Sequence, residues 1–468
     1  MRNIVNYSND KILLFLIFPI ALIFIIGGFV SEFYATTPFI SLVASFLFVI
    51  IIFANIAYGR NMLINPLSIF SFMYLGYVFG SFYYAFSDGD FGKFLSYLNL
   101  SRLEAELYLF YSILYAVVCY LFFVFGFSIF YKKKNVVLRG TWSGSYYDSL
   151  LLLYKPICFL LITIGLAYWV WMSYTLAGGV IPMLLYFQAF RHLIEDAQLS
   201  TLPYHLYYAG VFLWLIASVV KNNKVSFYFV LFSFIGLVIG LSTGRITLAF
   251  TYVMAQMIFY YFCFPEKRRK IIIFLFSLMS LGFVVYFLRI LSNQYFMGVD
   301  LDLSEKSFIG TIIGDGNITD LQQLVIVFKT FDSSNMLLGK SYLDTFRNTI
   351  GVHFGYEPHS IGLLIKELYI PSTSGAPTPG AIGEAYANFI FVGPAIIFLV
   401  GGVFSYIYMT VLDSKNPLVI MIYSIFLARF VFMYPKVDST MMVNFLWGAG
   451  PLIVIWFCLR LTFNLIKK

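Results

Sequence analysis

Long apolar runs separated by short polar segments follow one another along almost the whole chain. Each run is long enough to cross the ~30 Å hydrocarbon core of a bilayer as a helix. A helix satisfies its own backbone hydrogen bonds in lipid, whereas a membrane barrel would show short alternating strands. The pattern therefore predicts an all-α polytopic membrane protein with about twelve transmembrane helices, at residues 12–30, 38–57, 66–85, 107–130, 152–174, 205–220, 225–241, 246–264, 271–290, 384–411, 416–433 and 445–464.

Composition favours the same class. Of the 468 residues, 61% are hydrophobic and only 11% are charged, whereas soluble domains carry about 25% charged residues. The first run follows "MRNIVNYSNDK" and has no small-residue cleavage site before the next charge, so we expect a retained anchor and not a cleaved signal. The predicted organisation is a bundle of nine spans in 1–290, a large external loop in 291–383 and a bundle of three spans in 384–468.

Basic residues are concentrated in the loops on one side of this predicted bundle. That side holds 18 of the 30 Lys and Arg residues but only four of the 22 acidic residues, so its charge is about +14 against about −6 on the other side. By the positive-inside rule the basic side faces the cytoplasm, which places both termini there and the 291–383 loop outside. The net charge of +8 is thus a consequence of topology, and no soluble basic domain is left to bind nucleic acid.

The predicted outer side holds the polar groups that suit chemistry. All four histidines fall there, namely His192, His205, His353 and His359. The large loop contains "DLQQLVIVFKTF" and "KSYLDTFRNTI", whose apolar spacing is helical, and we expect amphipathic helices on the membrane surface. A histidine on such a loop is either simply solvated or, near neutral pH, able to accept a proton as a base.

Three arginines lie at the predicted outer ends of helices. Arg245 opens the eighth span in "LSTGRITLAF", Arg289 ends the ninth, and Arg429 lies inside the eleventh, about a turn from its outer end. A helix N-terminus offers free backbone N–H groups, and an Arg guanidinium adds paired N–H donors. Together they suit a phosphate or pyrophosphate at the membrane surface. The alternative for each is an Arg that extends its charge to the headgroup level.

The stretch "STSGAPTPGAIGEAYANFIFVGPAI" (372–396) places Glu384 and Asn388 at the predicted outer mouth of the tenth span. An acid in a first helical turn complements the helix dipole. Alternatively, Glu384 faces a cavity shared with the arginines and histidines. We expect residues 345–388, which include Arg347, to line that cavity.

The sequence offers little for a metal. The four cysteines lie within or at the edge of apolar runs and have no CxxC spacing, so a metal site or a disulfide framework is not expected. "DLD" at 300–302 is typical of metal-dependent nucleotide-sugar transferases, but that chemistry needs a soluble domain larger than the external loop. No metal and no cofactor are therefore predicted.

Several of these motifs, taken in order, resemble the bacterial O-antigen polymerases, which join oligosaccharide repeat units. The matching stretches are "STGRI" (242–246), "LLGKSYLDTF" (337–346), "PHS" (358–360) and "SGAPTPGAIGEAYANFIFVGPAI" (374–396), the last being the most specific. The motifs cover about 240–400, and the topology covers most of the chain.

The resemblance implies a membrane glycosyltransferase at the outer face of the bacterial inner membrane. Such an enzyme transfers a glycan from undecaprenyl pyrophosphate to a hydroxyl of another lipid-linked repeat unit. His359 is the likelier base, with His353 as the alternative, and Glu384 orients the base or the acceptor sugar. The predicted pyrophosphate- or sugar-binding residues are Arg245, Arg289, Arg347, Arg429 and Asn388. The lipid bilayer, a flippase and a chain-length regulator are the implied partners.

Two other functions share many of these features. An O-antigen ligase, which moves a finished glycan to a lipid core, uses the same leaving group. A flippase or other transporter would also have about twelve spans, but it favours charges near the bilayer midplane and broken helices with pseudo-symmetry. The large external loop favours an enzyme over a carrier.

The topology is testable with reporter fusions at residues 133, 268 and 335. We expect cytoplasmic signal at 133 and 268, inside the two basic clusters, and external signal at 335, because moving Lys and Arg across the membrane is unfavourable. A cytoplasmic signal at 335 would contradict an external site in the large loop.

Overall fold

The computed structural model describes most of the helical part of the chain. The described residues are 37–59, 63–86, 98, 100–132, 145–185, 202–222, 226–243, 246–278, 280, 321–351, 360–369, 378–414 and 416–466. These residues form helices, turns and short connections, and no strand is found among them. The predicted first span (12–30) and most of the ninth (271–290) lie outside the described residues.

The chain divides into two compact units, each built from segments far apart in sequence. Unit 1 comprises 1–135, 304–409 and 431–441, and unit 2 comprises 136–303, 410–430 and 442–468. The helices of unit 1 are α2 (Thr37–Gly59), α3 (Pro66–Phe86), α5 (Arg102–Phe130), α13 (Leu321–Thr330), α14 (Lys340–Gly351), α15 (Ile361–Tyr369), α16 (Gly380–Phe389), the 3-10 turn η5 (Ile390–Val392) and most of α17 (Gly393–Ser414).

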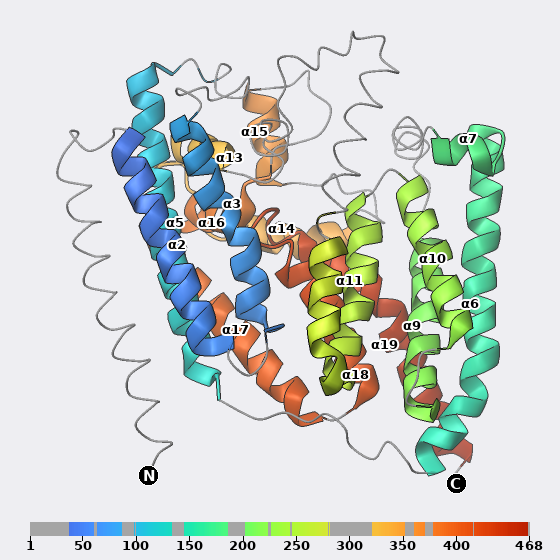
Figure 1. Ribbon diagram of the computed structural model, residues 1–468. Coiled ribbons are helices and arrows are strands. Elements are labelled where there is room, and N and C mark those ends of the chain that lie inside the picture. The colour runs from blue at the N-terminus through green and yellow to red at the C-terminus, as the bar shows by residue number, and fades with distance from the viewer. Residues whose placement is uncertain are drawn as a thin grey trace, which may run out of the picture. The chain divides into compact units, whose positions relative to one another are not determined.

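Unit 2 contains the remaining helices (Figure 1). They are α6 (Ser145–Ala177), α7 (Val180–Leu185), α9 (Leu202–Asn222), α10 (Phe227–Ser242), α11 (Ile246–Cys263), the short turn η2 (Pro265–Lys267), α18 (Pro417–Phe426) with its π-helical continuation η6 (Leu427–Val431), and α19 (Met441–Ile466). Spans from both ends of the sequence pack together in each unit, and the predicted domain boundaries at 290 and 384 stay a prediction.

Five helices of the described chain are long and apolar enough to cross a membrane, or six if the bent pair Thr247–Cys263 and Pro265–Leu278 is one span. Shorter apolar helices at Phe227–Ser242, Pro417–Val431 and Met441–Ile455 accompany them. The apolar runs that fall on described residues are thus helices, as the pattern predicts, and the protein is all-helical in this part. The number of twelve spans stays a prediction.

Side-chain caps explain where several helices begin. Ser101 precedes α5 and forms a capping box with Glu104, whose backbone N–H it accepts at 3.3 Å while the Glu104 carboxylate accepts the Ser101 N–H at 2.8 Å. Asn416 accepts the Leu418 N–H at 2.9 Å at the start of α18, where Pro417 fills the first helical position. These local signals are readable in the sequence.

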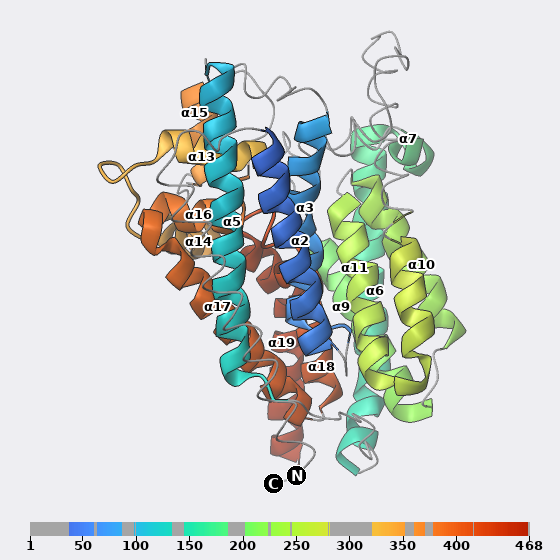
Figure 2. The same cartoon turned by 60° about the vertical axis from the view of Figure 1, so that its left-hand side comes forward.

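Close backbone contacts hold the core of unit 1 together. The helices α2, α3 and α5 lie side by side (Figures 1 and 2). Gly126 of α5 faces the backbone of Phe398, and Gly401 of α17 faces the backbone of Phe123, so neither position has room for a side chain. Small residues at such crossings let membrane-type helices approach closely. Phe70 stacks on Phe123 with ring centroids 3.9 Å apart, which adds aromatic packing between α3 and α5.

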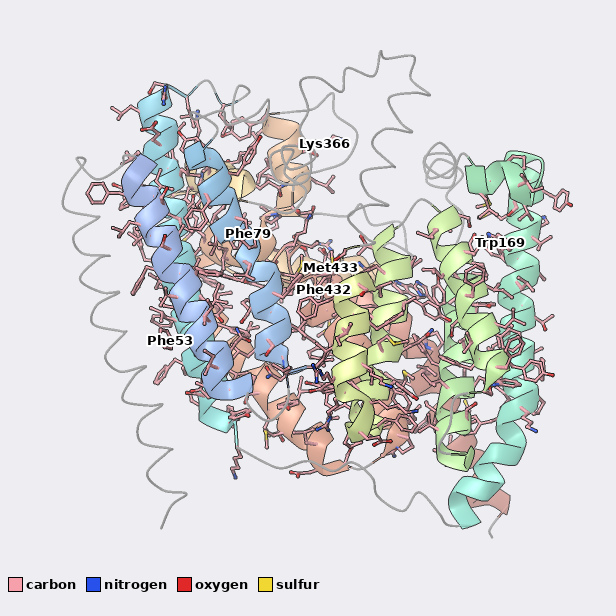
Figure 3. All side chains as sticks on the ribbon, viewed as in Figure 1. Phe53, Phe79, Trp169, Lys366, Phe432 and Met433 are labelled. Atoms are coloured by element: carbon pink, nitrogen blue, oxygen red, sulfur yellow. The ribbon has the colours of Figure 1, made fainter. Side chains whose placement is uncertain are left out.

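Tyrosines and a tryptophan fill the core of unit 2. Tyr208 on α9 packs against Tyr252 on α11 with centroids 4.2 Å apart, and its hydroxyl donates to the Gly236 carbonyl on α10 at 3.3 Å. Trp169 of α6 donates its indole N–H to Ser242 of α10 at 2.8 Å and is labelled in Figure 3. The polar ends of Tyr208 and Trp169 therefore each have a hydrogen-bond partner, as buried Tyr and Trp usually do.

The outer faces of the long helices are apolar. Phe53 on α2 and Phe79 on α3, both labelled in Figure 3, are 46% and 43% exposed. Large aromatic groups in contact with water would be unfavourable, but in contact with lipid tails they cost little. This is the surface expected of a bundle embedded in a bilayer.

Short helices form within 291–383 where the sequence predicts them, and they differ in what covers their apolar sides. In unit 1, α13 packs against α5 and α16 and buries Leu324, Val325 and Val327. Its apolar side therefore faces protein, and a position at the membrane surface stays a prediction. In contrast, α14 exposes Leu343 and Phe346 along one side, as an amphipathic surface helix would.

Gly380 provides a stability test of the fold. Its φ is +68°, and a Cβ at this position would lie 2.6 Å from the Pro435 carbonyl oxygen. Gly380→Ala is expected to lower the free energy of unfolding by about 2–4 kcal/mol, from the left-handed backbone and the overlap together. The matched control is Gly178→Ala, because Gly178 has φ +70° and no atom within 4 Å of the added Cβ. Equal losses for the two variants, measured by unfolding in detergent, would contradict the close packing at Gly380.

Candidate functional site

The start of α16 is held by the loop at 432–440. The backbone N–H of Gly380 donates to the Val437 carbonyl at 3.0 Å, and that of Ala381 donates to the Tyr434 carbonyl at 3.1 Å. The first N–H groups of a helix have no partner within it, so this loop supplies what a capping side chain otherwise would. Because α16 begins at Gly380, Glu384 lies more than one turn inside it. The predicted start of the span at Glu384 is therefore four residues late.

Glu384 is buried, with 2% of its surface exposed, and both carboxylate oxygens accept hydrogen bonds. Oε1 accepts from the hydroxyls of Ser341 (2.8 Å) and Ser439 (2.6 Å), and Oε2 accepts from the Ser439 backbone N–H (2.8 Å). These donors come from α14 and from the 432–440 loop. The carboxylate therefore joins three segments of unit 1, and it makes specific hydrogen bonds that a simple partner of the helix dipole would not need.

Asn388 extends the same network one turn further along α16. Its side-chain N–H groups donate to the Ser341 hydroxyl and to the Glu384 main-chain carbonyl, both at 2.7 Å. Its side-chain Oδ1 accepts the Gly339 N–H at 3.0 Å. The backbone N–H of Leu338, whose φ is +50°, also donates to the main-chain carbonyl of Asn388 at 3.1 Å. Asn388 thus fixes the turn that leads into α14, and its side chain is wholly used within the protein.

Asp438 is a second buried acid in this part of unit 1, with 5% of its surface exposed. Its φ of +154° is unusual for a residue with a side chain. Oδ1 accepts from the backbone N–H of Thr440 at 3.0 Å and from the Thr440 hydroxyl. Burial holds the pKa of Asp438 above its usual range, against the opposing effect of the Thr440 hydrogen bonds. No Lys or Arg among the described residues of unit 1 is buried, so these acids are stabilised by neutral donors.

The buried charge of unit 2 is Arg429, which lies in the π-helical turn η6 and is 3% exposed. Its Nη1 lies 3.3 Å from His205 Nδ1 on α9 and donates to the Asn444 carbonyl on α19 at 3.2 Å. The Tyr208 ring lies 6.0 Å from the guanidinium carbon. Within the described residues Nη2 has no hydrogen-bond partner and the guanidinium has no carboxylate. This is an incomplete environment for a buried cation.

The other predicted site residues are not brought together by the described chain. Arg347 is exposed on α14. His353, His359, Arg245 and Arg289 lie outside the described residues, and so does the "DLD" stretch. Of the predicted residues, Glu384 and Asn388 share one network in unit 1, while Arg429 belongs to unit 2.

Both clusters also contain residues to which the sequence assigned no role. In unit 1 these are Ser341, Ser439 and Asp438, and in unit 2 His205 is the partner of Arg429. Single serines carry no pattern that points to a distant carboxylate. "KVDST" (436–440) carries one usable signal, because it is polar and lies between two apolar runs. No group of three or more His, Cys, Asp or Glu side chains that could hold a metal is found among the described residues.

Comparison with known proteins gives no match, whether with family models, curated proteins or solved structures. The residues and their geometry therefore carry the functional argument.

The Glu384 network predicts coupled losses of stability. Ser341→Ala and Glu384→Gln should each lower the free energy of unfolding by about 1–3 kcal/mol, since each leaves buried groups without partners. The double variant should lose less than the sum, because the two side chains share a hydrogen bond.

The control for this cycle is Ser405→Ala in the same unit. The Ser405 hydroxyl is buried without a partner among the described residues, so its removal should change stability by less than about 0.5 kcal/mol. Unfolding in detergent measures all four variants. Additive losses for Ser341 and Glu384 would show that the hydrogen bond between them does not hold the fold.

Proposed function

We propose that this protein polymerises oligosaccharide repeat units carried on undecaprenyl pyrophosphate, at the outer face of a bacterial inner membrane. The growing glycan passes from its pyrophosphate to a sugar hydroxyl of the next lipid-linked unit, and undecaprenyl pyrophosphate leaves. The resemblance of 374–396 and its companion motifs to O-antigen polymerases suggests this reaction. The apolar helices provide the membrane setting that a polyprenyl substrate needs.

The observation that carries the proposal is the uncompensated guanidinium of Arg429. Burying a charge costs several kcal/mol unless an opposite charge or good hydrogen bonds offset it, and Arg does not lose its proton. Arg429 instead faces a neutral imidazole and a carbonyl, with Nη2 unused in the described chain. A pyrophosphate that arrives on a lipid would supply the missing anion, and the guanidinium would stabilise the charge that develops as it leaves.

The acidic cluster of unit 1 has a different role in this proposal. Glu384 accepts hydrogen bonds from Ser341 and Ser439, which tie it to α14 and the 432–440 loop, so we assign it to positioning and not to proton transfer. His359 is the proposed base, with His353 as the alternative, as the resemblance implies. Arg245, Arg289 and Arg347 are the further proposed contacts to pyrophosphate or sugar. The reaction uses no metal, and a flippase and a chain-length regulator would act before and beside it.

The surface glycan of a deletion strain separates this proposal from its rivals. A lipid core bearing one repeat unit supports a polymerase. A core with no repeat unit would instead support an O-antigen ligase or a flippase, and a glycan of normal length would contradict all three.

Arg429 gives the direct test with purified protein and lipid-linked repeat unit. Arg429→Gln should slow polymer formation at least about a hundredfold, the cost of ~3 kcal/mol of transition-state stabilisation. Arg429→Lys should retain part of the activity, because it keeps the charge but not the fork. Arg429→Gln should nevertheless unfold no more easily than the parent without substrate, since it removes a buried unpaired charge. Full activity of Arg429→Gln, or loss of parent activity in a strong chelator, would contradict the proposal.

A further inference from the structure

The guanidinium of Arg429 is held in one orientation by the two hydrogen bonds of Nη1. That nitrogen carries two hydrogens, and it has two acceptors: His205 Nδ1 at 3.3 Å and the Asn444 carbonyl at 3.2 Å. Nη2 carries two further hydrogens and has no acceptor among the described residues. The described residues therefore provide acceptors for both hydrogens of Nη1 and none for those of Nη2.

His205 fits this arrangement because of its tautomer. Arg can only donate, so a hydrogen bond with Nδ1 requires a neutral imidazole with an acceptor at that nitrogen. The His205 ring stacks on Trp447 of α19, with centroids 6.4 Å apart and planes 16° apart. His205 is thus an oriented acceptor, and its ring is fixed by packing.

Gly448 fits the arrangement because it has no side chain. It lies one turn after Asn444 on α19, so both face the same side of the helix. A Cβ at Gly448 would lie 2.5 Å from Arg429 Nη1 and 2.9 Å from both Cδ and Cζ. The guanidinium occupies the space that any other residue at this position would need.

We infer that His205 and Gly448 are positioning residues that hold Arg429 with its Nη2 edge directed at one phosphate-class anion. This rests on the proposed function for the identity of the anion as the pyrophosphate of a lipid-linked substrate. Binding involves no covalent step: phosphoryl oxygens accept the two Nη2 hydrogens and compensate the buried charge. A phospholipid headgroup or free phosphate has the same chemistry, so the source is decided by experiment.

The first experiment compares Gly448→Ala with Gly450→Ala. Both lie on α19, and apart from its two chain neighbours a Cβ at Gly450 meets no atom within 4 Å. In the polymerisation assay, Gly448→Ala should lower kcat/KM at least about tenfold through displacement of the guanidinium, and Gly450→Ala should leave it unchanged. In an Arg429→Lys background, Gly448→Ala should have a much smaller effect, because the displaced Nη1 is absent. Equal kcat/KM for the two alanine variants would overturn the role of Gly448.

The second experiment tests the acceptor on His205. His205→Phe keeps a ring against Trp447 but removes the acceptor, whereas His205→Gln keeps an acceptor and loses the ring. We expect His205→Phe to lower kcat/KM at least about tenfold and His205→Gln to restore part of it, a rescue that a merely packing role would not produce. Loss in His205→Gln with normal activity in His205→Phe would overturn the inference for this residue.

A binding measurement separates this inference from the proposed reaction. Thermal unfolding in phosphate-free maltoside detergent is followed with inorganic pyrophosphate, inorganic phosphate or phosphatidylglycerol, since a ligand of the folded state raises its stability. The parent and Gly450→Ala should be protected, and Arg429→Gln and Gly448→Ala should not.

Strongest protection by pyrophosphate supports both the anion site and the proposed substrate. Strongest protection by phosphatidylglycerol or by phosphate alone supports the anion site but counts against the proposed substrate. Equal protection of the parent and Arg429→Gln by every probe would overturn the site itself, whether or not the parent forms polymer.

Discussion

The hydrogen bonding between residues 434–439 and the first turns of α16 is the constraint on which unit 1 depends. The loop accepts the N–H groups of Gly380 and Ala381 and donates to Glu384 through both the backbone and the hydroxyl of Ser439. One segment thus caps a helix and satisfies a buried acid. Gly380 is needed because its positive φ and missing Cβ let the Pro435 carbonyl approach. Removal of the loop would leave orphan donors at the helix start and an acid that has lost two of its three donors.

In unit 2, the buried guanidinium of Arg429 makes fewer hydrogen bonds within the described chain than the buried carboxylate of Glu384 accepts in unit 1. Hydrogen bonds to a charged group each contribute about 1.5–3 kcal/mol net, so the three donors to the Glu384 carboxylate oppose the cost of its burial. Arg429 has two acceptors, both neutral, and half of its fork is unused in the described chain. Both oxygens of Glu384 therefore have donors in unit 1, whereas Nη2 of Arg429 has no acceptor among the described residues. This difference is the reason for assigning the acid to structure and the arginine to a ligand.

The helices could be predicted from the sequence where an apolar run or a helical spacing of apolar residues was the dominant pattern. The apolar runs at 38–57, 107–130 and 205–220 are helices, and "DLQQLVIVFKTF" and "KSYLDTFRNTI" also form the helices that their spacing predicts. The apolar face of the first of these two packs against α5 and α16. Periodicity shows which face is apolar but not whether protein or lipid covers it.

The breaks within apolar runs were not readable. The run at 384–411 is divided by Ile390, at φ +48°, whose carbonyl accepts the Tyr115 hydroxyl at 3.0 Å. Tyr115 is far from Ile390 in the sequence, so no local sequence pattern predicts the break in the helix at Ile390. The candidate residues Glu384, Asn388 and Arg429 were found because polar groups stand out in apolar runs. Their partners Ser341, Ser439 and His205 come from distant segments, and only the fold brings them together.

The two breaks differ in a way that bears on function. Irregular backbone among membrane helices is tolerated where protein or a cavity satisfies its polar groups. At Ile390 the protein does so, through Tyr115 and through the bond from the Ile390 N–H to the Tyr386 carbonyl. The π-helical turn at Leu427–Val431 instead places the Arg429 guanidinium in the core of unit 2, where its Nη2 has no hydrogen-bond partner among the described residues. π-helical turns are frequent at functional sites because the extra residue turns a side chain away from the regular helical face. The polar groups of the first break are thus satisfied within unit 1, and the second presents the donors to which we assign the proposed anion.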